Sequence, residues 1–166
     1  MQTKLIIIRG NSGSGKTTTA RILHRKLGSG TLLVSQDVVR REILQVKDTA
    51  HNLSVDLIGQ IAGYGFGKCE VVIVEGILAE DRYGVMLREL IAKFTPHVAV
   101  YYYDLTFEET LNRNQKKQSG FGRETMQRWF LPHDYLNVPE EHLLTDEMTL
   151  VQQDVVTKIL ADIERL

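Results

Sequence analysis

The order of apolar and polar positions along the chain predicts strands that alternate with helices. Residues 5–8 form a continuous apolar run, Leu-Ile-Ile-Ile, which is typical of a strand buried on both faces of a parallel sheet. Similar runs recur at 32–34, 71–74 and 98–102, and a weaker candidate lies at 142–144. Because such strands separated by helices form βαβ units, we expect a parallel sheet covered by helices on both faces.

Apolar residues at helical spacing occupy the segments between these strands. The predicted helical faces consist of Ala20, Leu23 and Leu27, then Tyr83, Leu87, Leu90, Ile91 and Phe94, and finally Val151, Val155, Ile159 and Ile163. Two further helices are predicted at 106–117 and 123–131, on either side of a polar, glycine-containing joint at 118–122. The glycines between 63 and 67 predict the end of a helix and a turn before the third strand.

Composition and charge exclude several classes of protein. The 166 residues are 43% apolar, which is enough to fill a core, so we expect one folded domain over residues 1–166. Twenty basic and 21 acidic side chains give a net charge of −1, which argues against binding to nucleic acid through bulk charge. The apolar runs are too short for a membrane span or a signal-peptide core, and the single cysteine, Cys69, cannot form an internal disulfide. These features predict a cytoplasmic protein without membrane association.

The segment from Gly10 to Thr17 fits the phosphate-loop pattern Gly-x-x-x-x-Gly-Lys-[Ser/Thr] in full, between the first strand and the first helix. Its glycines let backbone N–H groups turn toward phosphate oxygens, and the following helix directs the positive end of its dipole at them. Lys16 can reach the β- and γ-phosphates of a nucleotide, and the Thr17 hydroxyl can bind Mg²⁺. We predict that a nucleoside triphosphate is bound by Gly10, Asn11, Ser12, Gly13, Ser14, Gly15, Lys16, Thr17 and Thr18.

An acidic residue after the third strand completes the expected magnesium site. Glu75 and Gly76 directly follow the apolar run at 71–74. A carboxylate at the end of a strand near the phosphate loop is placed to hold Mg²⁺ or one of its waters. We therefore predict Thr17 and Glu75 as metal-binding residues; an ordinary polar residue at a strand boundary is the alternative interpretation of Glu75.

The surroundings of the phosphate loop decide between classes of nucleotide-binding protein. Residues 157–160 lack the guanine-reading segment of GTP-binding switches, and residues 53–57 lack the signature of transporter ATPases. The arrangement instead resembles the P-loop kinases that include 5′-hydroxyl polynucleotide kinases, zeta toxins, chloramphenicol phosphotransferase and adenylylsulfate kinase. This resemblance covers most of the chain. It implies a three-layer α/β/α fold with a five-stranded parallel sheet of order 2-3-1-4-5, a helical lid over about residues 106–137, and ATP with Mg²⁺ as cofactors.

The segment after the second strand also matches this group. Ser35–Arg40 is similar to the Asp-x-x-Arg of the polynucleotide-kinase-like members. The resemblance implies that Asp37 is the catalytic base that orients or deprotonates the acceptor hydroxyl, and that Arg40 binds substrate. Asp37 is in addition a suitable N-cap for a helix over Val38–Leu44, and both roles can hold together.

Basic side chains are concentrated between the fourth and fifth predicted strands. Residues 110–131 contain five basic side chains and one acidic side chain, Glu124. Such a run is by itself typical of a solvent-exposed helical face. The segment is also similar to the mobile lid of the P-loop kinases, and arginine suits a lid because its planar fork contacts two phosphate oxygens at once. The resemblance implies Arg123 as a catalytic residue, Arg113 as a nucleotide-binding residue and Arg128 as a substrate-binding residue.

These residues together predict an ATP-dependent kinase that transfers the γ-phosphate to a hydroxyl of a small molecule, such as a nucleoside or a related metabolite. Residues 74–78 also resemble the strand end of uridine kinases and phosphoribulokinases, whereas polynucleotide-kinase-like proteins more often have aspartate at the position of Glu75, so the class of acceptor stays open. A nucleic-acid end with a 5′-hydroxyl is the second candidate acceptor, disfavoured by the low net charge. A nucleotide-binding regulator without an acceptor is the alternative of a different class.

Overall fold

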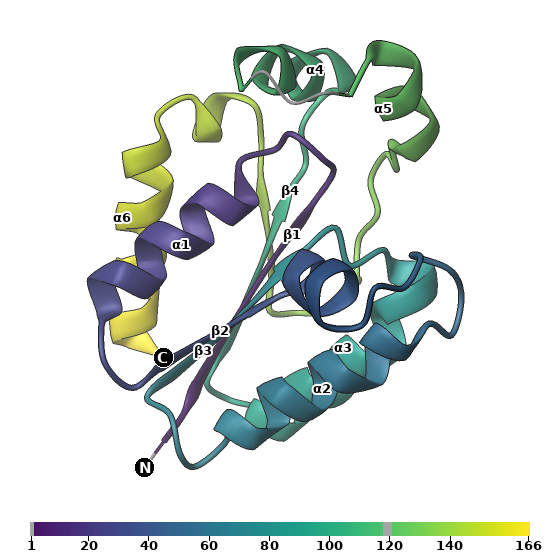
Figure 1. The fold of residues 1–166 in the computed structure, drawn as a ribbon. Coiled ribbons are helices and arrows are strands. Elements are labelled where there is room, and N and C mark those ends of the chain that lie inside the picture. Colours follow the sequence, from purple (N-terminus) through teal and green to yellow (C-terminus); the bar gives the residue numbers. More distant parts are fainter. Residues whose placement is uncertain (1, 118–120) are drawn as a thin grey trace.

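The computed structural model describes residues 2–117 and 121–166, so part of the joint expected at 118–122, namely 118–120, lies outside the described residues. Five parallel strands form one sheet in the order β2-β3-β1-β4-β5 (Figure 1), which confirms the predicted order. The strands are β1 (Lys4–Gly10), β2 (Thr31–Ser35), β3 (Val71–Gly76), β4 (Val98–Tyr103) and β5 (Glu141–Leu144).

The central strand β1 is buried on both faces because its apolar run supplies each face with alternate residues. Leu5 and Ile7 belong to the core cluster on one side of the sheet, and Ile6 and Ile8 belong to the cluster on the other. Ile6 pairs with Ile73 of β3 and also with Ala99 of β4. The strand that leads into the phosphate loop is therefore held from both sides.

Helices cover both faces of the sheet, as expected. The cluster that contains Ile6 is closed by α1 (Lys16–Leu27) and α6 (Gln152–Arg165), and the cluster that contains Leu5 is closed by α2 (Leu53–Gly65) and α3 (Glu80–Phe94). Figure 1 shows these two pairs of helices on opposite sides of the strands. The end of α2 at Gly65 confirms the helix end predicted from the glycines between 63 and 67.

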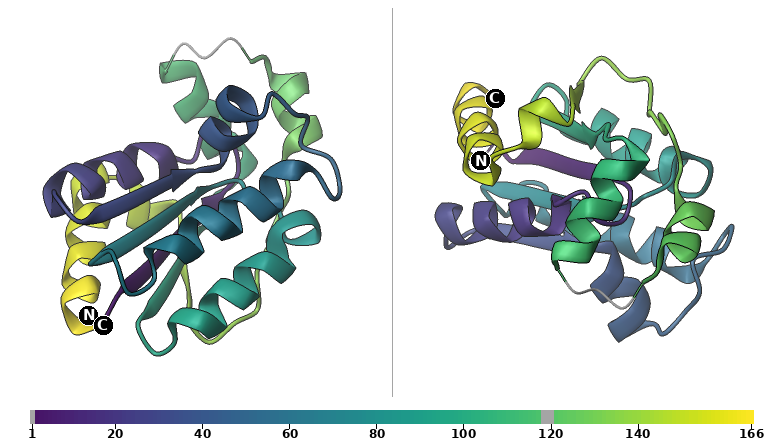
Figure 2. Two further views of the ribbon diagram at one scale, coloured as in Figure 1. Left: turned by 60° about the horizontal axis from the view of Figure 1, so that its bottom comes forward. Right: turned by 90° about the horizontal axis from the view of Figure 1, so that it is seen from above.

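Two short helices lie beyond the carboxyl ends of the strands, α4 (Phe107–Lys116) and α5 (Arg123–Trp129), which we call the lid helices. They confirm the two helices predicted in this part of the chain, and they are seen from above in the right panel of Figure 2. The side chain of Thr106 caps α4 by accepting a hydrogen bond from the N–H of Glu109 at 3.3 Å. A 3₁₀ turn (Glu147–Thr149) joins β5 to α6.

The segment after β2 corrects one prediction. Residues Val38–Ile43 form a π-helix, with the N–H of Leu44 donating to the carbonyl oxygen of Val39 at 3.0 Å. Asp37 already has helical backbone angles, φ −66° and ψ −37°, and its side chain makes no capping hydrogen bond. The prediction that Asp37 caps this helix is wrong, because an N-cap residue requires extended backbone and a carboxylate that turns back onto the first N–H groups.

Across the described parts of the chain, no helix combines the length and the apolar character needed to cross a membrane.

Candidate active site

The phosphate loop has the backbone that its glycines predict. Gly13 and Gly15 have φ values of +81° and +99°, and a Cβ at Gly13 would lie 2.6 Å from the carbonyl oxygen of Thr110 in α4. Lys16 begins α1 and is buried, and its Nζ donates to the carbonyl oxygen of Asn11 at 3.1 Å. Burial lowers the pKa of Lys16, and the nearby carboxylate of Glu75 opposes that shift. The loop thus holds the Lys16 ammonium group beside the site where phosphate oxygens would lie.

Hydroxyl groups from α1 and β2 fix Glu75 in place. Glu75 is buried near the end of β3; its Oε2 accepts from Thr17 Oγ1 at 2.9 Å and its Oε1 accepts from Ser35 Oγ at 2.5 Å. Hydroxyl and carboxylate oxygens are the hard donors that Mg²⁺ takes, so Thr17 and Glu75 fit a magnesium ion. Sequence reasoning missed Ser35. The pairing of β2 with β3 places Ser35 beside Glu75, and this register explains their hydrogen bond.

Asp37 faces the phosphate loop across a small cavity of about 100 Å³. The lining residues come from the loop, β3, the π-helix and the lid: Ser12, Lys16, Thr17, Asp37, Arg41, Glu75, Gly76, Ile77, Phe121 and Trp129. The structure therefore brings together four residues predicted from the sequence, namely Lys16, Thr17, Asp37 and Glu75.

The arginine that shares this cavity is Arg41 rather than the predicted Arg40. Both guanidinium groups reach Asp37 Oδ1, Arg40 through Nη2 at 3.4 Å and Arg41 through Nε at 3.3 Å. Arg40 is 13% exposed and its Nη1 donates to the carbonyl oxygen of Val46 at 3.1 Å, which turns it toward the loop that follows the π-helix. The side chain of Arg41 is 51% exposed and lines the cavity.

The three lid arginines have different surroundings. Arg113 donates through Nη1 to the carbonyl oxygen of Ser14 at 2.9 Å and through Nη2 to Thr149 Oγ1 at 2.8 Å, so it lies directly on the phosphate loop. Arg123 pairs with Glu108 and stacks over Phe107, 5.4 Å from the ring centroid.

Arg128 lines a separate surface cavity with Glu124 and Gln127. The structure thus brings Arg113 to the nucleotide site and leaves Arg123 and Arg128 outside the 100 Å³ cavity. Part of the charge excess predicted for the lid is neutralised within it, since Glu109 pairs with Arg113 and Glu108 with Arg123.

Asn11 connects the phosphate loop to the end of the lid. Its Nδ2 donates to the carbonyl oxygen of Leu131, and its Oδ1 accepts from the N–H of Leu131, both at 2.8 Å. The side chain of a loop residue therefore pairs with the backbone that follows α5 as a neighbouring strand would. The sequence predicts Asn11 as a loop residue, but the contact with Leu131 spans 120 residues and no local pattern indicates it.

A buried arginine holds the chain on the other side of this connection. Arg9 directly precedes Gly10 and is fully buried; its Nη2 pairs with Asp134 at 2.8 Å and its Nη1 with Glu141 at 3.3 Å. Its Nε donates to the carbonyl oxygen of Leu78 at 3.1 Å. Burial lowers the pKa of the Arg9 guanidinium, and the two carboxylates oppose that shift. The segment after α5 is thus tied to the strand that carries the phosphate loop.

Comparison with known proteins places the chain in a family. Residues 5–127 match a family model described as an AAA domain, which covers most of the chain. The protein belongs to this AAA domain family. No curated protein matches the sequence.

Solved structures similar to this AAA domain protein include several kinases. An APS kinase from Mycobacterium tuberculosis is 17% identical, with a TM-score of 0.72 and coverage of 98% of each chain. A gluconokinase from Sinorhizobium meliloti is 14% identical, with a TM-score of 0.66, 98% of this chain and 92% of that chain being covered. A shikimate kinase from Acinetobacter baumannii is 19% identical, with a TM-score of 0.63 and coverage of 98% and 94%. At these identities the likeness shows that the AAA domain protein has the fold of the P-loop kinases.

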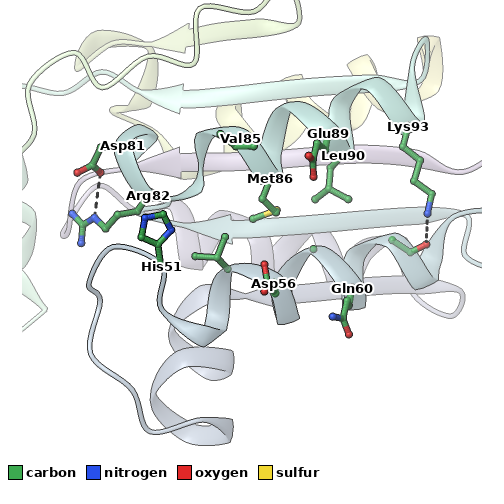
Figure 3. A pocket seen from close by; sticks show the side chains of 13 residues that line it. His51, Asp56, Gln60, Asp81, Arg82, Val85, Met86, Glu89, Leu90 and Lys93 are labelled. Atoms are coloured by element: carbon green, nitrogen blue, oxygen red, sulfur yellow. Dashed lines mark hydrogen bonds and ion pairs between the residues drawn. The ribbon is translucent and has the colours of Figure 1, made fainter.

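A larger cavity of the AAA domain protein, of about 630 Å³, lies away from the phosphate loop. It is a groove between α2 and α3, where Met86 and Leu90 form part of the floor and Asp56 and Glu89 stand at the sides (Figure 3). Lys93 Nζ donates to the carbonyl oxygen of Gly63 at 3.2 Å and bridges the two helices at one end. None of the phosphate-loop residues lines this groove, so its size does not make it the site of phosphate chemistry.

Proposed function

We propose that this protein is an ATP- and Mg²⁺-dependent kinase that transfers the γ-phosphate to a hydroxyl of a small molecule, a nucleoside or a related metabolite. The observation that carries the proposal is the common cavity of Lys16, Thr17, Glu75 and Asp37. A nucleotide-binding protein without an acceptor has no need of an exposed carboxylate opposite its phosphate loop. The side chain of Asp37 is 65% exposed, so it is open to a second ligand.

The residues divide between the donor and the acceptor. The loop residues from Gly10 to Thr17, with Thr18 and Arg113, would hold the triphosphate, and Thr17 with Glu75 would hold Mg²⁺. When bound, Mg²⁺ supplies charge neutralisation on the phosphate oxygens. Lys16 would stay bonded to the phosphates throughout, because its side chain is buried and it is the first residue of α1.

Asp37 would orient the acceptor hydroxyl and accept its proton. Phosphoryl transfer needs an in-line nucleophile more than covalent help from the protein, and a single carboxylate near the acceptor supplies that alignment. The two guanidinium groups at Asp37 Oδ1 leave Oδ2 as the oxygen that meets the hydroxyl. We include Arg123 and Arg128 in the proposal as lid residues that act after closure, which requires Arg123 to leave Glu108.

The test is an ATP-consumption assay over nucleosides, sugars, hydroxylated antibiotics and oligonucleotides with a free 5′-hydroxyl. We expect turnover that depends on one class of acceptor and is abolished by Lys16→Ala. Asp56→Asn is the matched control for acidic variants, because Asp56 is an exposed carboxylate in the distant α2–α3 groove. Binding of ATP without acceptor-dependent turnover across the whole panel would favour the regulator instead.

A further inference from the structure

The 100 Å³ cavity between Asp37 and the phosphate loop is also lined by an aromatic pair that the proposed transfer of phosphate does not use. Phe121 and Trp129 line the cavity from the lid, with ring centroids 5.0 Å apart and ring planes at 72°. Trp129 is 42% exposed and Phe121 is 39% exposed. Large aromatic rings left open to solvent beside a ligand cavity are suited to stack on a planar ring of the ligand.

Arg41 brings a cation to the same cavity from the π-helix. Its Nε pairs with Asp37, while its two terminal amino groups have no hydrogen-bond partner among the described residues. Arg40 differs, because its Nη1 and Nη2 both have partners. A guanidinium with two free amino groups at a cavity rim is a fork for an oxyanion such as phosphate, sulfate or carboxylate.

We infer that the acceptor is an alcohol that joins a planar ring to an anionic group, as a nucleotide does, rather than a neutral nucleoside or a sugar. This inference rests on the proposed function, because it assigns the ligand of the same site. Trp129 and Phe121 take the ring, Arg41 takes the anionic group, and the hydroxyl between them meets Asp37. A neutral sugar would use neither the ring surface nor the guanidinium fork.

The two recognition elements lie on different parts of the fold. The aromatic pair belongs to α5 and the segment before it, whereas Arg41 and Asp37 belong to the π-helix after β2. A ligand that contacts both therefore bridges the lid and the sheet. Ring and anionic group should each contribute to binding, and both together should bind more tightly than either alone.

Trp129 is the only tryptophan of the chain, so its fluorescence reports directly on stacking in this cavity. The donor site is first saturated with a non-hydrolysable ATP analogue and Mg²⁺. Adenosine, adenosine monophosphate and ribose 5-phosphate are then titrated, with the uracil series in parallel, and Trp129 is excited at the red edge of its absorption, where the bases absorb little.

We expect the nucleotides to quench Trp129 and to bind at least about tenfold more tightly than the nucleosides, as one charge-assisted contact predicts. Ribose 5-phosphate should bind more weakly still and leave the fluorescence unchanged.

Substitutions at Arg41 and Phe121 test the contact with the anionic group and the contact with the ring separately. Arg41→Gln should remove the preference for nucleotide over nucleoside and leave quenching by the nucleoside intact, whereas Arg25→Gln, an exposed arginine on α1, should change neither. Phe121→Leu retains the reporter and should weaken ring-bearing probes by about fivefold or more, the lower range of a stacking contact. Tyr64→Leu is its control, because Tyr64 is an exposed aromatic residue in α2 and does not line this cavity.

The outcomes distinguish this inference from the proposed function. Equal affinity for nucleotide and nucleoside, quenching by ribose 5-phosphate, or no binding of any probe while the ATP analogue binds would overturn the inference. The proposed function fails separately, if the predicted binding pattern is found and no bound probe supports consumption of ATP. A nucleotide that binds as predicted and also accepts phosphate supports both.

Discussion

Replacing Ser35 by alanine tests whether its hydroxyl group orients Glu75 in the predicted metal site. Ser35→Ala removes the 2.5 Å hydrogen bond to Glu75 Oε1 and leaves the bond from Thr17 to Oε2 in place. Because the accepting carboxylate is buried, the lost bond is of the charge-assisted kind, and we expect the unfolding free energy of the unliganded protein to fall by about 1.5–3 kcal/mol. The measurement is urea unfolding of the variant beside Ser29→Ala, which alters an exposed serine in the turn between α1 and β2.

The same substitution should weaken the metal site. Without Ser35, the one hydrogen bond left to the Glu75 carboxylate among the described residues comes from Thr17, the residue that must itself bind the metal. Loss of a residue that orients a metal-binding group typically costs about 10–100-fold in metal affinity, so the Mg²⁺ concentration for half-maximal binding of a non-hydrolysable ATP analogue should rise by that factor. Calorimetry over a series of Mg²⁺ concentrations measures it. A Mg²⁺ requirement within about threefold of wild type, well below this range, would refute the reasoning that Ser35 orients Glu75 for the metal.

Three further predictions concern the base, the lid and the acid limit of stability. Asp37→Asn should lower kcat by about 10²–10⁴-fold, the scale of one general base, with unchanged affinity for the ATP analogue in calorimetry. Asn11→Ala removes the two hydrogen bonds between the Asn11 side chain and the backbone of Leu131, and should lower the unfolding free energy by about 1–3 kcal/mol in urea unfolding. Burial acts to raise the pKa of Asp162, but hydrogen bonds from Lys158 and Tyr101 outweigh it and hold that pKa below its ordinary value. This contribution to stability is present above the unfolded-state pKa and lost as pH falls through the lower folded-state pKa, so Asp162→Asn should destabilise the protein at neutral pH and much less in acid.

A definite outcome would contradict each of these three predictions. Turnover of Asp37→Asn within about threefold of wild type, with Asp56→Asn as reference, would exclude Asp37 as the base. An unfolding free energy of Asn11→Ala equal to that of Asn112→Ala, an exposed lid position, would show that the end of the lid is not held by Asn11. Equal destabilisation of Asp162→Asn at neutral and acid pH would show that the hydrogen-bonded carboxylate is not the source of the acid sensitivity.

Local patterns in the sequence predicted the parts of the site that depend on neighbouring residues. A strand buried on both faces must be apolar throughout, so the run at 5–8 located β1, and the glycine pattern located the loop after it. Glu75 was predicted because it is the first charged residue after an apolar run. Ser35 was missed because its role comes only from the pairing of β2 with β3. A serine at a strand end has no special meaning without that register.

A different cause explains why the sequence pattern indicated Arg40 whereas the structure places Arg41 in the cavity. Along an ordinary helix both residues lie within reach of Asp37, and the spacing of Asp-x-x-Arg indicated the first of them. The carbonyl oxygen of Val46 captures Arg40, and this carbonyl is supplied by a loop whose path the sequence pattern does not predict. The contacts of Arg9 and Asn11 with residues more than 100 positions away were outside local reasoning for the same reason.

The central position of β1 has a consequence for how the protein folds. β1 comes first in the sequence, yet its two partners arrive late: Lys4 pairs with Val71, and Leu5 pairs with Val98. During synthesis the apolar strand leaves the ribosome long before β3 and β4 exist to cover it, and pairings of such long sequence separation form slowly. The phosphate loop therefore acquires its shape only after about two thirds of the chain has been made, and until then residues 5–8 are the segment most in need of protection from aggregation.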